Sequence, residues 1–175
     1  MKEALSRKLV ESAPRLYGIG SKRPLAYFEV QDGWYNILLD LSKKLEVEIQ
    51  RSAVEHNGLC SWCDHPENSH QHEGCIGEEN CFCIEFAIEL PQAVQVKEKF
   101  GGLRFYMSQE TPEMSLLIDE ACLASKATCE VCAEKGRLHT IGMWVSCLCD
   151  KHAEKQNRKI ADRRGAQTTA QVAPK

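Results

Sequence analysis

Apolar positions from Trp34 onward recur at steps of three and four residues, as they do on one face of an α-helix. This spacing predicts a long amphipathic helix over residues 34–55, which begins directly after Asp32-Gly33. Its apolar face consists of Trp34, Ile37, Leu38, Leu41, Leu45, Ile49 and Val54. A shorter helix is expected over residues 2–16, where apolar and charged residues alternate at helical spacing.

The pattern becomes β-like in the second half of the chain. Apolar and polar residues alternate on both sides of Gly101-Gly102, which predicts a β-hairpin within residues 86–107. Farther on, residues 143–146 have the composition of a short strand.

Two further helices are expected from their start signals. Thr111-Pro112 has the residue types of a helix N-cap and first helical position, so a helix should continue from there to about Lys126. A last helix should start near Asp150 and fray from Gly165 into a polar tail. Together these elements predict an α+β fold, a small helical domain with a β-hairpin.

Charge and composition indicate the cellular compartment of the protein and the state of its cysteines. The formal net charge is −3, with no Lys or Arg from residue 52 to residue 96 and an excess of both after residue 150. The N-terminus has no apolar core of a signal peptide, and no stretch approaches the ~18 apolar residues of a membrane span. We therefore expect a cytoplasmic protein without a membrane partner. In a reducing compartment the ten cysteines are expected to be metal ligands or core thiols rather than disulfides.

Two cysteine pairs near the C-terminus have the spacing of a zinc site. Cys129 and Cys132 are separated by two residues, and Cys149 and His152 repeat that spacing. Pairs of this kind are typical of zinc ribbons and treble clefs, where four protein ligands close the metal site. Cys147 is a competing ligand, but the Cys-x2-His spacing at a helix start is the commoner geometry. A closed site has no open position for water, so we predict a structural zinc ion.

A second cluster precedes the hairpin, in a stretch that is too polar to build a hydrophobic core. Its potential ligands are Cys60, Cys63, His65, His70, His72, Cys75, Cys81 and Cys83. They predict a second zinc ion, bound in one of two ways. One set is Cys60, Cys63, Cys81 and Cys83. The other is Cys63, His70, Cys75 and one of Cys81 or Cys83. An open, hydrolytic zinc site with Glu67 or Glu73 is a third hypothesis, which no His-Glu-x2-His helix supports.

The hairpin string VKEKFGGLRFYM, residues 96–107, combines cations and aromatic residues. Its candidate binding residues are Lys97, Lys99, Arg104 and Tyr106. The cations could contact phosphates while Phe100, Phe105 and Tyr106 stack on bases. The simpler interpretation places the aromatic rings in the core against the helix of Trp34, because strand aromatics usually serve in packing.

Three motifs give the chain a resemblance to a family of small, poorly characterised proteins of bacteriophage and prophage genomes. They are Asp32-Gly33-Trp34-Tyr35, the string from Val96 to Tyr106, and Cys129-Glu130-Val131-Cys132 followed by Cys149-Asp150-Lys151-His152. The resemblance covers residues 1–56 and 92–153 and leaves out residues 60–83. Cys147 departs from it, since relatives more often have a small polar residue there. The resemblance implies a phage or prophage origin but no activity.

We predict five regions, held together by two structural zinc sites. They are an N-terminal helical part (1–59), a Cys/His-rich loop (60–85), the hairpin and helix (86–128), a zinc-ribbon-like or treble-clef-like module (129–155) and a flexible basic tail (156–175). No nucleophile–base pair, paired carboxylates or phosphate-binding loop is recognisable. The favoured function is a non-enzymatic binding protein that acts on a host protein, for example by inhibiting a bacterial defence component. A nucleic-acid binder using the hairpin and tail is the alternative, and a metal-dependent hydrolase at the Cys60–Cys83 cluster is the third.

Overall fold

The computed structural model describes residues 1–19, 24–25, 27–55, 70–71, 74–75 and 90–170. Four α-helices are present in this part: α1 (Glu3–Ser12), α2 (Tyr35–Glu55), α3 (Pro112–Ser125) and α4 (Asp150–Ala170), with a 3-10 turn η1 (Asp32–Trp34) before α2. The strands form antiparallel pairs, β1 (His70–Gln71) with β2 (Gly74–Cys75), β3 (Ala93–Lys99) with β4 (Gly102–Met107) and β5 (Arg137–Ile141) with β6 (Trp144–Leu148). The α+β class is confirmed.

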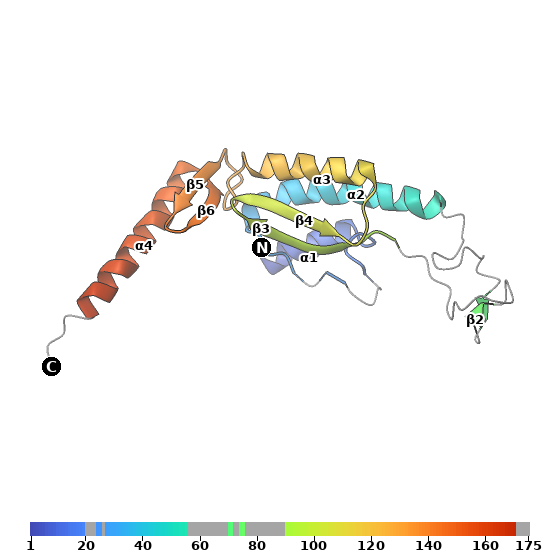
Figure 1. Ribbon diagram of the computed structural model, residues 1–175, viewed down its shortest axis with the longest axis horizontal. Helices are drawn as coiled ribbons and strands as arrows, with labels where there is room; N and C mark the ends of the chain where they lie inside the picture. Colours follow the sequence, from blue (N-terminus) through green and yellow to red (C-terminus); the bar gives the residue numbers. More distant parts are fainter. Residues whose placement is uncertain (20–23, 26, 56–69, 72–73, 76–89, 171–175) are drawn as a thin grey trace.

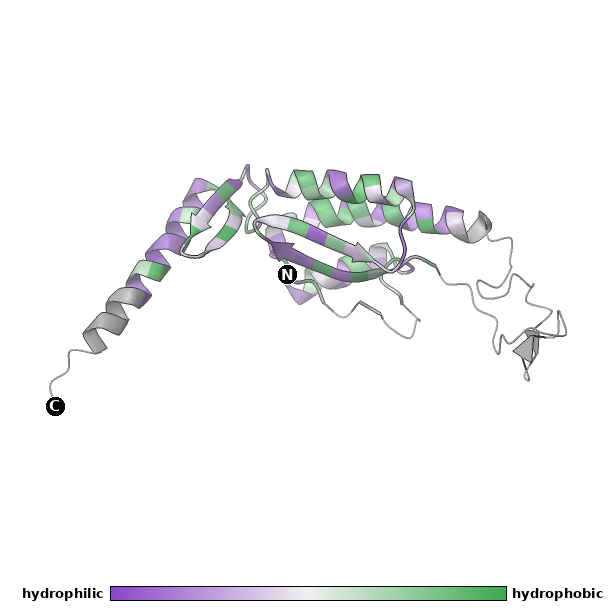
Figure 2. Cartoon of the chain, in the orientation of Figure 1, coloured by the Kyte–Doolittle hydropathy of each residue, from purple (hydrophilic) through white to green (hydrophobic). Residues whose placement is uncertain are grey.

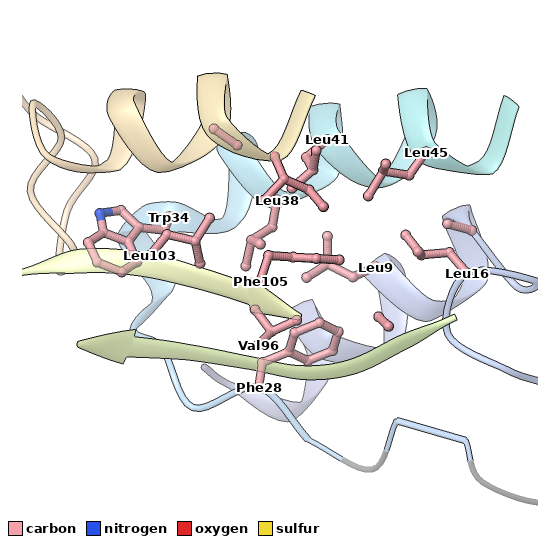
Figure 3. Packing of buried hydrophobic residues seen from close by; sticks show 14 of the residues in the cluster. Leu9, Leu16, Phe28, Trp34, Leu38, Leu41, Leu45, Val96, Leu103 and Phe105 are labelled. Atoms are coloured by element: carbon pink, nitrogen blue, oxygen red, sulfur yellow. The ribbon is translucent and has the colours of Figure 1, made fainter. Parts of the chain in front are cut away.

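The main core lies between the helices and one face of the β3–β4 hairpin. Figure 1 shows α2 and α3 side by side over the hairpin, and α1 packs against α2. In Figure 3 the side chains of Val96, Leu103 and Phe105 point from the strands toward Leu38 and Trp34. The interior also takes in Leu9, Leu16, Leu41, Leu45 and Ile49, all of them buried. The apolar face predicted for residues 34–55 is therefore the face that packs, and burying it supplies most of the driving force for folding.

The first helix is shorter than the sequence indicated. It ends at Ser12 rather than near residue 16, because Ala13 precedes Pro14 and leaves the helical conformation, with φ −148° and ψ 68°. The turn that follows is held by the buried carboxylate of Glu46, which accepts the backbone N–H groups of Arg15 and Leu16 at 3.3 and 2.9 Å.

Other element boundaries agree in part. Thr111 is the N-cap of α3, and its hydroxyl accepts the Met114 N–H at 3.3 Å, as expected. The strand expected at residues 143–146 is one arm of the β5–β6 hairpin, whose other arm was not predicted. The last helix was expected to fray from Gly165 and the region from residue 156 to be a flexible tail. Instead, α4 continues to Ala170 and projects away from the body (Figure 1). Figure 2 shows that the coloured part of α4, nearest the β5–β6 hairpin, is largely hydrophilic.

Residues 128–130 dock onto the start of α2, although they follow it by more than 90 residues. The Trp34 indole N–H donates to the carbonyl of Thr128 at 2.9 Å, and the Gly33 N–H donates to the carbonyl of Glu130 at 2.7 Å. A Cβ atom at Gly33 would lie only 2.3 Å from the Cys129 carbonyl oxygen. Two of the three motifs of the phage resemblance, the Asp-Gly-Trp segment and the first cysteine pair, are thus in direct contact.

Candidate metal centre

The structure brings the four predicted C-terminal ligands together. One ligand atom from each of Cys129, Cys132, Cys149 and His152 lies within 4.8 Å of the other three. Cys129 and Cys132 stand on the turn before β5, and Cys149 and His152 stand at the start of α4, so the β5–β6 hairpin separates the two pairs. The arrangement could hold a metal ion such as Zn²⁺.

The distances between the ligand atoms fit a tetrahedron. With Zn–S bonds of ~2.3 Å and Zn–N bonds of ~2.0 Å, a tetrahedral site places two sulfurs ~3.8 Å apart and a sulfur and a nitrogen ~3.5 Å apart. The Sγ atoms of Cys132 and Cys149 are 3.8 Å apart, and Cys129 Sγ lies 3.6 Å from His152 Nδ1. The Cys149 Sγ to His152 Nδ1 distance is shorter, 3.2 Å. The ring nitrogen on the metal side is therefore Nδ1.

Hydrogen bonds from backbone amides lower the pKa of the Cys129 thiol, which favours the thiolate that binds a metal ion. Burial acts to raise the pKa of the Cys129 thiol, but N–H groups of Cys149, Val131 and Cys132 donate to its sulfur and bring its pKa below the usual value. The Cys132 side chain is exposed, yet its sulfur faces the cluster, where loss of hydration and the sulfurs of Cys129 and Cys149 raise its pKa to about 11. Three sulfurs this close ionise together only with a cation between them, which a divalent metal ion supplies.

Close backbone packing shapes the turn that holds the first pair. A Cβ atom at Gly136 would lie 2.5 Å from the Cys129 nitrogen, so only glycine fits there. Ala133 has a positive φ of 66°, and its N–H donates to the Cys129 carbonyl at 2.9 Å. At the second pair, the Asp150 carboxylate accepts two bonds from Arg137 at 2.7 and 3.1 Å, which tie the start of α4 to β5.

Cys147 does not belong to the cluster. It is buried in the main core, and its thiol donates to the Lys126 carbonyl at 3.2 Å. Its pKa is raised, chiefly by burial, as expected of a core thiol rather than a metal ligand. The sequence-based preference for Cys149 and His152 over Cys147 agrees with this placement.

The middle cluster lies almost entirely outside the described residues. This applies to Cys60, Cys63, His65, His72, Cys81 and Cys83, while His70 and Cys75 are described only in their backbone, as Cα partners in β1–β2. The second zinc ion and its ligand set stay a prediction.

The candidate binding residues of the hairpin lie on the face of β3–β4 that is turned away from the core. Lys97 pairs with Arg104 across the strands, and the Lys97 ammonium lies 5.4 Å from the ring centre of Tyr106. Phe105 faces inward and is buried, so its role is packing. Phe100, expected among the core aromatics in the simpler interpretation, is instead exposed at the turn, and Tyr106 is also largely exposed. The packing interpretation therefore holds for one of three rings.

A buried carboxyl group in the first cysteine pair was not predicted. Glu130 is buried, and the Gln31 side-chain amide donates to its Oε1 at 2.5 Å. Burial, and to a lesser degree the nearby charge of Glu98, raise the pKa of Glu130 to about 7. Its backbone N–H donates to the Cys147 carbonyl at 3.0 Å, so this residue links the metal-site turn to both the start of α2 and to β6.

Comparisons of the chain with models of protein families, with curated proteins and with solved structures found no match. The relation to the phage and prophage family therefore stays a prediction. Within the described part of the chain, every helix is too short or too polar to cross a membrane.

Proposed function

We propose that the chain is a zinc-stabilised, non-enzymatic binding protein that acts on a protein of a bacterial host. The Cys129–His152 cluster supports the first half of this proposal. Three thiolates and an imidazole in a tetrahedron are typical ligands of structural zinc. All four positions are taken by side chains, so the ion would hold the fold and would not activate water.

The observation that carries the binding role is the tip of the β5–β6 hairpin. Met143 is 93% exposed and Trp144 is 76% exposed, side by side at the turn. Tryptophan and methionine are enriched in protein interfaces, where a buried Trp often supplies a large part of the binding energy. A Cβ atom at Gly142, in the same turn, would lie 3.5 Å from Ile160 Cδ1, so the hairpin tip packs against α4.

The class of target follows from the resemblance to phage proteins. A protein encoded by a phage or prophage meets host proteins, and components of antiviral defence are natural targets for it. We propose that binding through the hairpin tip obstructs such a host protein.

A capture experiment tests this proposal. The tagged wild-type chain is compared with Met143→Ser/Trp144→Ser in nuclease-treated lysate of the bacterial source. We expect a host protein that is retained by the wild type and reduced at least tenfold by the double variant, because two apolar anchors are lost.

The matched control is Leu116→Ser/Leu123→Ser, which removes two exposed leucines from α3 and should leave capture unchanged. Equal capture by wild type and the hairpin variant would contradict the proposed role of the tip. A protein that is retained from untreated lysate but not from nuclease-treated lysate would favour a nucleic-acid target instead.

A row of cations on α4 favours the nucleic-acid alternative. Lys151, Lys155, Lys159 and Arg163 follow one another at four-residue steps, and all are exposed. Residues at this spacing lie on one side of a helix, so the projecting α4 carries a positive stripe suited to phosphates.

Salt dependence tests that alternative. If α4 contacts phosphates, the affinity for a fluorescent 30-nucleotide single strand should fall steeply between 50 and 200 mM salt. Lys151→Gln/Lys155→Gln/Lys159→Gln should then flatten the slope of log affinity against log salt by about 2, at ~0.7 per contact. Lys43→Gln on α2 is the control. A weak wild-type slope, or an unchanged slope in the triple variant, would reject α4 as a phosphate-binding surface.

The third hypothesis, a metal-dependent hydrolase at Cys60–Cys83, concerns residues that lie largely outside the described part of the chain. It stays a prediction of the sequence.

A further inference from the structure

The turn between β3 and β4 contains an aromatic residue in an unfavourable backbone conformation. Lys99 pairs with Gly102, and the two residues between them, Phe100 and Gly101, have φ values of 55° and 73°. Positive φ at both central positions identifies a type I′ turn, in which asparagine or aspartate followed by glycine is the usual sequence. A bulky side chain at the first position is a steric outlier.

Burial does not compensate for this conformation. Phe100 is 70% exposed and is not part of the core, and its one recorded ring contact is the ammonium of the neighbouring Lys99 at 5.4 Å. The ring therefore costs backbone energy and exposes apolar surface at the same time. Residues with a strained backbone of this kind concentrate at functional sites, where other interactions or the function itself offset the cost of the strain.

Apolar and cationic groups from other elements converge on the same turn. A Cβ atom at Gly101 would lie 2.5 Å from Leu138 Cδ2, so Leu138 of β5 covers the turn, and it is 52% exposed. A Cβ atom at Gly102 would lie 3.3 Å from Arg104 Nη1 and 3.4 Å from Lys126 Cε, so both cationic side chains pass close to the turn. Figure 1 shows this end of the hairpin directed toward the β5–β6 module.

The cations at the turn are available to a ligand. Within the described part of the chain, no carboxylate pairs with Lys99, Arg104 or Lys126. Arg104 donates one guanidinium N–H to the Leu103 carbonyl at 2.9 Å, which leaves its other N–H groups for a ligand. The carboxylate nearest the turn, Glu98, accepts the Gly101 N–H at 2.5 Å and so supports the turn itself. The cations Arg104 and Lys126 and the exposed apolar side chains of Phe100 and Leu138 thus lie within one small surface.

We infer that Phe100, Leu138, Arg104 and Lys126 form a docking surface for an acidic segment of a partner protein that carries a large apolar side chain. Phe100 and Leu138 would contact the apolar side chain, while Arg104 and Lys126 would pair with flanking carboxylates. This inference rests on the proposed function and adds a second contact, with a defined chemistry, to the one at Trp144.

The surrounding charge favours a protein segment over a nucleic acid. A polyanion needs a continuous path of cations. Beyond the turn, the flank of β3 instead borders a surface hollow lined by Glu29, Glu98 and Glu130. The carboxylates of Glu29 and Glu98 would repel a phosphate backbone that extended past the tip, whereas a short acidic segment needs only the local pair of cations.

Replacing Phe100 with asparagine separates binding from folding. Asparagine tolerates positive φ, so Phe100→Asn should keep or raise the thermal unfolding temperature. Random 16-residue peptides displayed on phage are selected on the wild-type chain after depletion on Phe100→Asn. We expect the enriched peptides to combine Asp or Glu with Trp, Phe or Leu. Their affinity should fall at least tenfold in Phe100→Asn and at least threefold in Arg104→Gln/Lys126→Gln.

The outcomes are distinct. The inference is overturned if no peptide binds the wild type more tightly than Phe100→Asn, or if the enriched peptides lack acidic residues. It is overturned as well if a (dT)20 strand binds the same surface more tightly than the enriched peptides do. It is also overturned if Phe100→Asn lowers stability while peptide binding is unchanged, since Phe100 would then be structural. Host-protein capture that depends on Trp144 but not on Phe100 would leave the proposed function intact and remove only this surface. If neither Met143→Ser/Trp144→Ser nor Phe100→Asn reduced capture of the host protein, the result would count against both the proposed role of the hairpin tip and the docking surface.

Discussion

Replacing Cys129 and Cys149 together with serine is expected to remove one zinc ion per chain and to unfold the module of residues 129–155. The small apolar cluster of this module consists of Cys129, Ile141, Leu148 and Ala153, three of which lie beside or within the ligand set in the sequence. A core of that size cannot offset the conformational entropy of about 25 ordered residues. Structural zinc supplies ~10 kcal/mol or more, so its loss exceeds what the remaining contacts provide.

Cys147→Ser is the matched control, because Cys147 is buried a few residues away but its thiol donates to the Lys126 carbonyl and lies outside the ligand cluster. It should keep the full zinc content and lose only ~1–2 kcal/mol of stability for a polar substitution in the core. Zinc per chain is measured by elemental analysis after dialysis, and folding by circular dichroism. Unchanged zinc content in the double variant would show that the cluster at His152 binds no metal ion. Equal loss in Cys147→Ser would show that the ligand set is wrong.

Gly33→Ala is expected to destabilise the protein by more than ~3 kcal/mol. The added Cβ would lie 2.3 Å from the Cys129 carbonyl oxygen and 2.6 and 2.7 Å from the Glu130 carbonyl atoms. These are backbone atoms on a turn that the metal site fixes, so they cannot move aside as a flexible side chain would. Relief requires separating α2 from the turn, which also breaks the Trp34–Thr128 and Gly33–Glu130 hydrogen bonds.

Gly102→Ala is the control for Gly33→Ala. Its Cβ would meet only the far ends of Arg104 and Lys126, at 3.3 and 3.4 Å, and those side chains can shift. We expect a change within about 1 kcal/mol in urea unfolding monitored by circular dichroism. If Gly33→Ala were as mild as Gly102→Ala, the close contact between the start of α2 and the metal-site turn would not exist in solution.

Local patterns predicted the elements that have a strong periodic or capping signal. The 34–55 helix follows from its apolar repeat, the hairpin from Gly101-Gly102, and α3 from Thr111-Pro112. The four C-terminal ligands followed from their spacing alone, because a tetrahedral metal site constrains spacing more tightly than packing does.

Elements stabilised by distant partners were missed. Strand β5, with the sequence Arg137-Leu-His-Thr-Ile141, has one buried residue and no clear alternation, since it is held by β6 and the metal-site turn rather than by a core face. The contact of Gly33 with Cys129 joins segments far apart in the chain and leaves no local signal. The unfavourable turn conformation of Phe100 is also invisible in the sequence, where Gly101-Gly102 predicted a turn one residue later.

The contact between Gly33-Trp34 and the metal-site turn has a consequence for how such a protein can evolve. Recombination exchanges gene fragments, and a compact metal-binding module would ordinarily move between genes as a unit. Here the module's first cysteine sits against a glycine and is bridged through Thr128 to a tryptophan, 94 residues earlier. In a recombinant that acquires the module without a matching Asp-Gly-Trp segment, the contact between the two would pack poorly. The two motifs should therefore be gained, lost and altered together.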